Sequence, residues 1–182
     1  MDSINKNQPE QNIKNLAGAK AAEKIKELAE GAESCFFITG IKTGSHPATR
    51  PMAVQEVDAA GNFWFLSAID SHKNVEVLLD PKVQLLFQGS KHSDFLSVYG
   101  TATISRDKGR IKELWKPLMK VWFTEGENDP RISIIKIEPI QSYYWDNKHG
   151  SAVAFVKMIA GAIIGETLDD SIEGNLSVAY RG

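Results

Sequence analysis

Short runs of alternating hydrophobic and polar residues dominate the chain, and helical spacing is confined to a few segments between them. The runs typical of β-strands are Ser34–Ile41, Thr49–Val57, Asn62–Ser67, Val83–Gln88, Phe95–Ile104 and Ile132–Trp145. Gly61 supplies the positive φ angle of a tight turn, which predicts a hairpin between the second and third runs. Gly100 is expected at a bulge or a close approach.

Helical spacing predicts an amphipathic helix over residues 13–30 that ends at Gly31. A short helix is predicted over residues 71–79, with Ser71 as its N-cap and a stop at Asp80-Pro81. Helical spacing returns over residues 106–121, where Pro117 is expected to kink or split the helix. Six or so strands with only short helices between them favour an antiparallel barrel or sandwich over a parallel sheet.

The 182 residues fit one domain, expected over residues 13–150. Residues 1–12 are polar and are expected to be disordered or loosely attached. Residues 151–182 are expected to comprise a short apolar helix near 152–164 and a polar tail.

Composition narrows the classes of partner. The net charge of −2 gives no basic face for a nucleic acid, so DNA and RNA are not expected. The polar N-terminus lacks the apolar core of a secretory signal, and the longest apolar stretch is interrupted by Lys157 and too short to span a membrane. A single cysteine, Cys35, is expected to be a buried, inert thiol. Together these features predict a cytoplasmic protein.

Two cations occupy positions suited to a phosphate. Arg50 opens a strand, and Lys73 lies at the start of the helix predicted over 71–79, beside Ser71 and His72. An arginine fork, a lysine ammonium and the N–H groups of a helix N-terminus would together bind a phosphate dianion. The alternative is that both cations are solvated surface residues, where Arg and Lys usually lie.

Aromatic residues could supply the walls of a ligand site. Trp64 and Phe65 are adjacent on a strand, so only one of them can face a given ligand, and both could instead be core residues. Trp115 and Trp122 flank the helix predicted over residues 106–121 and precede a loop, where they would line a pocket or a subunit interface. The four histidines, at positions 46, 72, 92 and 149, show no ligand spacing, so no metal site is expected.

Several segments in one order resemble the FMN-binding split β-barrel family of pyridoxamine 5'-phosphate oxidase, and within it the general stress protein 26 group. The segments are RPMAVQEVD, the turn glycine Gly61, WFLS, SHK, DPKVQLLF, SVYGTATIS, ELWKPLMKVWFTEGENDP and the final YYWD. The resemblance implies a mainly β fold with flanking α-helices: a six-stranded antiparallel Greek-key split β-barrel that forms a homodimer.

The resemblance also implies the residues that contact the cofactor FMN. Arg50, His72 and Lys73 would contact its phosphate, and the strand that follows Arg50 would lie along the flavin. Trp122 is expected to come from the other subunit. The full set is Arg50, Pro51, Met52, Ala53, Val54, Gln55, Phe65, Leu66, Ser67, Ser71, His72, Lys73 and Trp122.

Three positions depart from the pattern of the oxidase. Gln55 replaces a lysine of the pyridoxal phosphate site, Phe95 replaces a glutamine that reaches the flavin, and His72 replaces an arginine. The oxidase's C-terminal Arg-Leu-His segment is also absent. We therefore expect a flavin-dependent redox protein acting on an unknown small molecule, and not a pyridoxamine phosphate oxidase. One alternative is a non-catalytic flavin-binding or flavin-sensing stress protein, and no acid, base or nucleophile decides between these two. A third reading is a barrel that has lost its ligand and serves as an interaction module.

Overall fold

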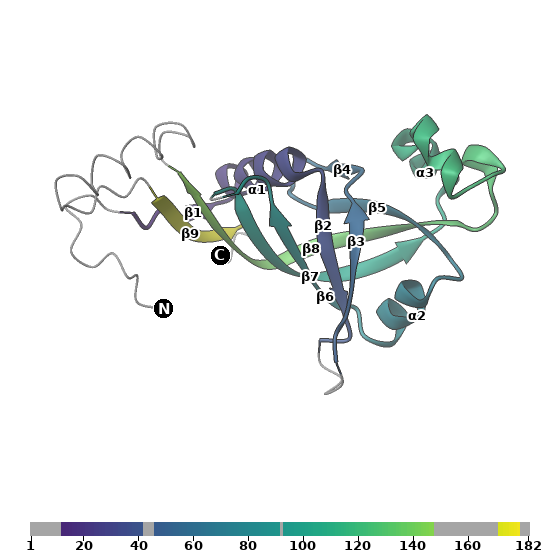
Figure 1. Ribbon diagram of the computed structural model, residues 1–182, viewed down its shortest axis with the longest axis horizontal. Coiled ribbons are helices and arrows are strands. Elements are labelled where there is room, and N and C mark those ends of the chain that lie inside the picture. Colours follow the sequence, from purple (N-terminus) through teal and green to yellow (C-terminus); the bar gives the residue numbers. More distant parts are fainter. Residues whose placement is uncertain (1–11, 42–45, 92, 148–170, 179–182) are drawn as a thin grey trace.

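The computed structural model describes residues 12–41, 46–91, 93–147 and 171–178 (Figure 1). Within these ranges the fold is mainly β, with three α-helices around one curved mixed sheet of nine strands. The strands are β1 (Leu16–Ala17), β2 (Ser34–Thr39), β3 (Ala48–Ala53), β4 (Glu56–Val57), β5 (Phe63–Ala68), β6 (Lys82–Gln88), β7 (Phe95–Ser105), β8 (Ile132–Asn147) and β9 (Ser171–Ser177). The helices are α1 (Ala19–Ala32), α2 (His72–Leu79), α3 (Lys108–Leu114) and the 3₁₀ helices η1 (Pro117–Val121) and η2 (Gly126–Asn128).

Strand β8 is the centre of the sheet. It pairs with β5 near its start, with β7 along most of its length and with β9 at its end. The main order of strands is β1-β9-β8-β7-β6-β2-β3, and β4 pairs with β5. The prediction of a mainly β fold is confirmed, but the number of strands was wrong. The described strands number nine rather than six, β1 and β9 are parallel, and the sheet is not closed.

The predicted N-terminal helix was too long at its start. Helix α1 begins at Ala19, and the preceding residues pair with β9 instead. The backbone N–H of Gly18 donates to the carbonyl oxygen of Ser177 at 2.9 Å, and Gly18 takes the positive φ of 57° at which the chain changes direction. The apolar spacing of residues 13–17 was compatible with a helix, but sheet hydrogen bonds to β9 satisfy this backbone.

The predicted hairpin between residues 49–57 and 62–67 is correct only next to its turn. Strand β3 pairs with β2 along its whole length, from Ser34 opposite Ala53 to Thr39 opposite Ala48. Only the two residues of β4 pair with β5, around a turn in which the N–H of Gly61 donates to the carbonyl of Asp58. One continuous strand-like run therefore serves two parts of the sheet, and β3 lies at a sheet edge.

The remaining local predictions concern a bulge, a helix break, a helix cap and the C-terminal segment. A bulge lies at Tyr99/Gly100, where a Cβ on Gly100 would be 2.7 Å from the carbonyl oxygen of Glu138, as the sequence predicted. The helical stretch is split before Pro117 into α3 and η1. Ser71 occupies the N-cap position of α2, but its side chain does not cap the helix. The helix predicted near 152–164 lies outside the described residues, and β9 was not predicted.

Two hydrophobic clusters hold these elements together. The larger packs α1 against the sheet, with Ile25 and Leu28 on the helix and Phe37 and Phe65 on the strands. The rings of Phe37 and Phe65 meet edge to face at a centroid distance of 5.4 Å. The smaller cluster packs α3 and η1 against β5 and β8. Helix α2 lies near the end of the sheet where β3 begins, which positions the site described next (Figure 1).

Candidate functional site

Arg50 forms an ion pair with α2. It lies on β3 opposite Phe37 of β2, and its Nη1 is 2.7 Å from Oε2 of Glu76. The hydroxyl of Thr39, at the end of β2, donates to the same carboxylate oxygen. Burial alone would raise the pKa of Glu76, but the hydrogen bonds from Arg50 and Thr39 and the nearby His72 lower it overall. Glu76 is therefore a carboxylate held in its ionised form.

Lys73 lies close enough to Arg50 for the two charges to interact. Burial is the main cause that lowers the pKa of Lys73, the charge of Arg50 lowers it further, and the charge of Glu76 opposes both. Lys73 forms no ion pair with any of the described residues. The fold thus brings together Arg50 from a strand and Lys73 from the start of a helix. The negative charge of Glu76, which pairs with Arg50, also acts on Lys73.

A buried polar network fixes the first turn of α2. Asn74 is 1% exposed, and its amide Nδ2 donates to the hydroxyl of Ser133 on β8 at 2.7 Å. The Ser67 hydroxyl donates to Oδ1 of Asn74 at 2.9 Å, and the Ser133 hydroxyl donates to the backbone carbonyl of Ser67. Ser71 joins the network through its hydroxyl, 3.1 Å from that of Ser67. The helix start that carries His72 and Lys73 is therefore bonded to two neighbouring strands.

The residues after Arg50 alternate along β3. Met52 and Val54 pack against the larger hydrophobic cluster, whereas Pro51 and Ala53 are exposed. The side chain of Gln55 donates from Nε2 to the carbonyl of Ala53 at 3.1 Å. Its Oε1 is buried and accepts no hydrogen bond from the described residues. An acceptor without a donor is costly to bury, so this atom is a candidate for a ligand contact.

Phe65 and Leu66 offer no side chain to a ligand in this conformation. Phe65 is fully buried in the larger cluster, and Leu66 lies in the smaller one. Trp64, the neighbour on the opposite face, is covered by Arg110 of α3, whose guanidinium carbon lies 4.2 Å from the ring centroid. A contact from this strand would have to come from backbone atoms.

Trp122 is a solvent-exposed side chain in the single chain. It follows η1, is 64% exposed and makes no hydrogen bond to Arg50, His72 or Lys73 in the described part of the chain. Leu118 and Val121 on η1 are also exposed. The contact that Trp122 would make from the other subunit remains a prediction for this exposed residue.

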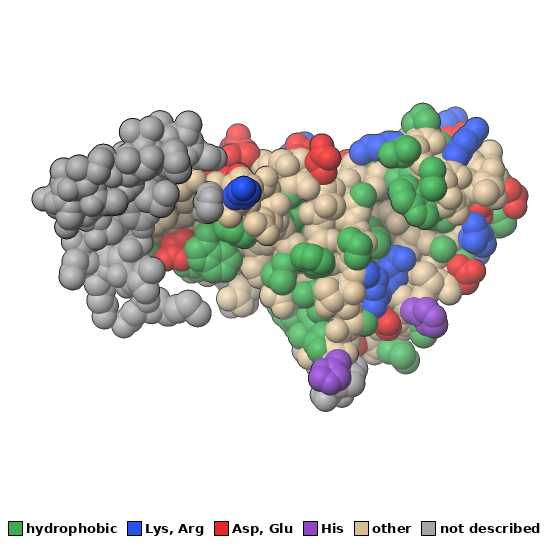
Figure 2. Space-filling view, in the orientation of Figure 1, with side chains coloured by type: hydrophobic (Ala, Val, Ile, Leu, Met, Phe, Trp, Pro, Cys, Tyr) green, Lys and Arg blue, Asp and Glu red, His purple; other side chains and the backbone are tan. Residues whose placement is uncertain are grey.

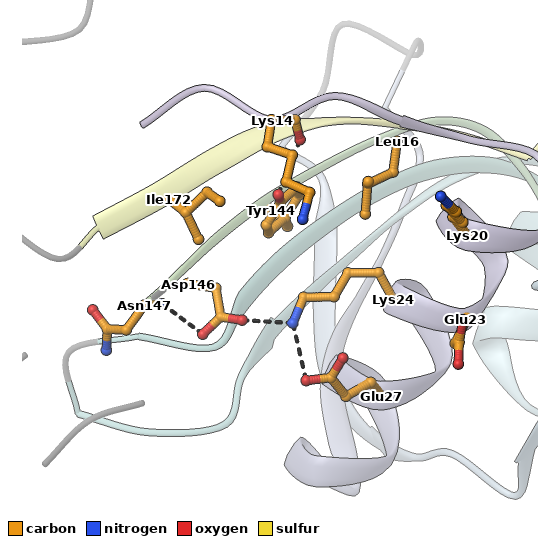
Figure 3. A pocket seen from close by; sticks show the side chains of 10 residues that line it. All are labelled: Lys14, Leu16, Lys20, Glu23, Lys24, Glu27, Tyr144, Asp146, Asn147 and Ile172. Atoms are coloured by element: carbon orange, nitrogen blue, oxygen red, sulfur yellow. Dashed lines mark hydrogen bonds and ion pairs between the residues drawn. The ribbon is translucent and has the colours of Figure 1, made fainter. Parts of the chain in front are cut away.

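A separate pocket of about 490 Å³ lies between α1, β8 and β9, and Figure 3 shows its side chains. Lys24 of α1 reaches across to Asp146 of β8 at 2.6 Å and to Glu27 at 2.9 Å. Burial lowers the pKa of Lys24, but its two carboxylate partners raise it overall. None of the residues predicted for the phosphate site lines this pocket. The ion pair joins α1 to the end of β8.

Sequence patterns missed Glu76, Thr39, Asn74 and Ser133. Glu76 is three residues after Lys73, one helical turn away, and this spacing was the only available signal. The other three are single polar residues whose partners are distant in the sequence.

The profile of the family "Pyridoxamine 5'-phosphate oxidase like" matches residues 20–169. The chain belongs to this family. It is also similar to the crystal structure of general stress protein 26 from Bacillus anthracis str. Sterne, with 25% identity and a TM-score of 0.59 over 68% of this chain and 92% of that one. A protein assigned as a general stress protein 26 from Jannaschia sp. CCS1 gives a TM-score of 0.69 over 87% of this chain and 99% of that one. Its 21% identity makes that likeness one of fold.

Among curated proteins, the chain is similar to Protein bli-3 of Neurospora crassa, with 28% identity over 112 residues. The match covers 57% of this chain and 53% of that protein, so it spans about half the length of the relative. In the described part of this family member, no helix is long and apolar enough to cross a membrane.

Proposed function

We propose that this member of the family binds FMN non-covalently, with the phosphate held by Arg50, Lys73 and the start of α2. The observation that carries the proposal is the convergence of these two cations from separate elements. Arg50 offers a planar fork and Lys73 a point charge that has no ion-pair partner among the described residues. His72 and the hydroxyl of Ser71 lie at the same helix start. A phosphate monoester carries the charge that this set of donors would neutralise.

Residues 51–55, which follow Arg50, span enough length for the ribityl chain and the ring of FMN. Gln55 is five positions after Arg50, which corresponds to about 16 Å along a fully extended chain. An FMN with an extended ribityl chain can bridge such a span between phosphate and ring. The unpaired Oε1 of Gln55 would then accept a hydrogen bond from a ring N–H. The segment 51–55 would position the flavin, and the backbone around Phe65, Leu66 and Ser67 would lie behind it.

A second copy of the chain would complete the site. Among the described strands, β3 pairs on one side only, with β2. The exposed side chains of Phe36 and Leu86 lie side by side on the outer face, next to Pro51. Figure 2 shows hydrophobic side chains gathered over this part of the sheet, beside Lys, Arg, Asp and Glu side chains. Exposed apolar patches of this kind mark interfaces. In a homodimer, the exposed Trp122 of one subunit would form a wall of the flavin site of the other.

When bound, FMN supplies hydride or electron transfer, and the protein supplies binding and orientation. We propose a redox protein of the cytoplasm that acts on a small molecule other than pyridoxamine phosphate. The reason is that Gln55, Phe95 and His72 depart from the oxidase pattern at three positions.

The proposal is tested by purifying the protein without added cofactor and identifying any bound ligand by mass and absorption spectrum. We expect FMN, or an apoprotein that takes up FMN when it is titrated. A Soret band, which indicates a bound haem in place of a flavin, would reject the proposal, and so would the absence of any flavin uptake. Reduction of the bound flavin by NADH or NADPH without oxygen, followed by turnover with added acceptors, would separate an enzyme from a protein that only stores or senses the flavin.

A further inference from the structure

The carboxylate of Glu76 already forms an ion pair with the guanidinium group of Arg50, to which the proposed phosphate would bind. Arg50 Nη1 and Glu76 Oε2 are 2.7 Å apart, and both side chains are largely covered, with exposed fractions of 24% and 30%. The Thr39 hydroxyl, itself in a fully buried residue, donates to the same oxygen. Glu76 is thus firmly held against Arg50, and the pair is not a loose surface contact.

The charges of this cluster do not match a phosphate dianion while Glu76 is ionised. Arg50 and Lys73 contribute two positive charges, and Glu76 removes one of them. A phosphate that approaches Arg50 meets a second anion at hydrogen-bonding distance from the same guanidinium. Like charges at such separations repel, and a half-buried site screens this repulsion less than open water does.

We propose that Glu76 is an internal counter-anion, which a phosphate must displace from Arg50 in order to bind. This inference rests on the proposed function, because it assigns a specificity role within the same site. Glu76 lowers affinity for the phosphate group alone and leaves binding of the flavin ring unaffected. Its presence therefore reduces the preference of the protein for FMN over riboflavin, which has the same ring and ribityl chain but no phosphate.

The test compares both ligands in the wild-type protein and in Glu76→Gln. Glutamine keeps the length of the side chain and an oxygen that can accept from Thr39 and Arg50, but it removes the negative charge. Dissociation constants are measured by quenching of flavin fluorescence. We expect FMN to bind about 3- to 30-fold more tightly to the variant, the range that one unit charge several ångström away produces in a partly screened site. The affinity for riboflavin is expected to stay within about twofold, since no charge of the ligand changes.

Glu113→Gln is the matched control. Glu113 pairs with Arg110 at 2.8 Å on α3, so this substitution also removes one carboxylate from an arginine pair, but at another place in the fold. It is expected to change neither affinity. Glu76→Ala removes the same charge without introducing an amide, and it must give the same order of affinities if Glu76→Gln is poorly folded.

The outcomes separate this inference from the proposed function. Unchanged or weaker FMN binding in both Glu76 variants, with riboflavin unchanged, overturns the inference and assigns Glu76 to holding Arg50 in place for the phosphate. A wild-type protein that binds neither flavin rejects the proposed function. A wild-type protein that binds both flavins equally, with no gain in the variants, rejects the phosphate site.

Discussion

The side-chain amide of Asn74 donates a 2.7 Å hydrogen bond to the hydroxyl of Ser133, and this bond joins the first turn of α2 to β8 across 59 residues of sequence. The oxygen of the same amide accepts from Ser67 on β5. Asn74 is almost fully buried and hydrogen-bonds to residues of two strands at once. The two residues before it, His72 and Lys73, are those proposed to contact the phosphate.

Replacing Asn74 with alanine is expected to lower the free energy of unfolding by about 1–3 kcal/mol, because it removes the buried hydrogen bonds that the Asn74 amide makes with the hydroxyls of Ser67 and Ser133. FMN affinity should fall as well, since the start of α2 loses its attachment. Urea unfolding and flavin titration measure the two effects. Asn175→Ala on β9, where the asparagine is exposed, should leave both nearly unchanged. Full stability in Asn74→Ala would show that the network does not fix the helix.

The double variant Arg50→Ala with Lys73→Ala is expected to weaken FMN binding by several kcal/mol. Each charge-assisted hydrogen bond to a phosphate contributes about 1.5–3 kcal/mol. Riboflavin affinity should change much less, because riboflavin has no phosphate. The control is Lys20→Ala with Lys26→Ala, which removes two exposed cations from α1. FMN titration decides the matter, and an affinity equal to that of the wild type would reject the site.

Binding that depends on subunit association gives a separate prediction. If the site is shared between two copies, the apparent FMN affinity should rise with protein concentration over the range in which dimers form. Trp122→Ala should then reduce FMN affinity although Trp122 makes no hydrogen bond to the cations of its own chain in the described structure. Sedimentation velocity with and without FMN measures the association. A monomer that binds FMN with full affinity would contradict a shared site.

The ion pair between Arg50 and Glu76 could be predicted only in part from the sequence. Each cation carries a local signal, Arg50 in the first half of a strand and Lys73 at the start of a helix, so their nearness could be anticipated. The only signal for Glu76 is its spacing of three residues from Lys73, because its partners Arg50 and Thr39 lie 26 and 37 residues away and are brought near by the docking of α2. A similar difficulty applies to Asn74, whose role depends on the register of β5 against β8.

Strand β9 and the start of α1 escaped prediction for the same physical reason. The β9 sequence SIEGNLS has few apolar residues: Leu176 is buried in the core, and Ile172 packs against it while partly exposed. Its strand conformation comes from pairing with β8 and β1, not from its own alternation. Conversely, the apolar spacing of residues 13–17 fitted a helix until that pairing was known. Local propensity was enough to predict the central strands, whereas β1 and β9 become strands because they pair with residues distant in the sequence.

Cys35 is expected to be unreactive in the folded protein. The thiol is 5% exposed, and burial raises its pKa to about 12, so almost no thiolate is present at neutral pH. Ellman's reagent should therefore react slowly with the native chain and quickly after urea unfolding. Rapid reaction of the native protein would show that the edge formed by β2 and β3 opens frequently. FMN binding should leave the native rate low.

Asp58 is predicted to make stability depend on pH on the acid side. Burial alone would raise the pKa of this carboxyl, but hydrogen bonds from Asn62, from the indole of Trp64 and from the backbone of Ala60 lower it below the ordinary value of 3.8. A group whose folded pKa is lowered contributes stability above its unfolded pKa, and this stability is lost as the pH falls through the folded value. Melting temperatures of the wild-type protein should therefore decline below a pH of about 4.

Asp58→Asn should lower the melting temperature at neutral pH, because the amide cannot accept all of these bonds, and should flatten the decline in acid. Asp70→Asn is the matched control, since Asp70 is exposed and accepts no hydrogen bond from the described residues. It should keep the dependence on pH seen in the wild type. An equally steep acid decline in Asp58→Asn would mean that other carboxylates, and not the turn between β4 and β5, determine acid stability. The indole of Trp64 donates to this same carboxylate at 3.0 Å, so its fluorescence should change over the same pH range in the wild type and not in Asp58→Asn.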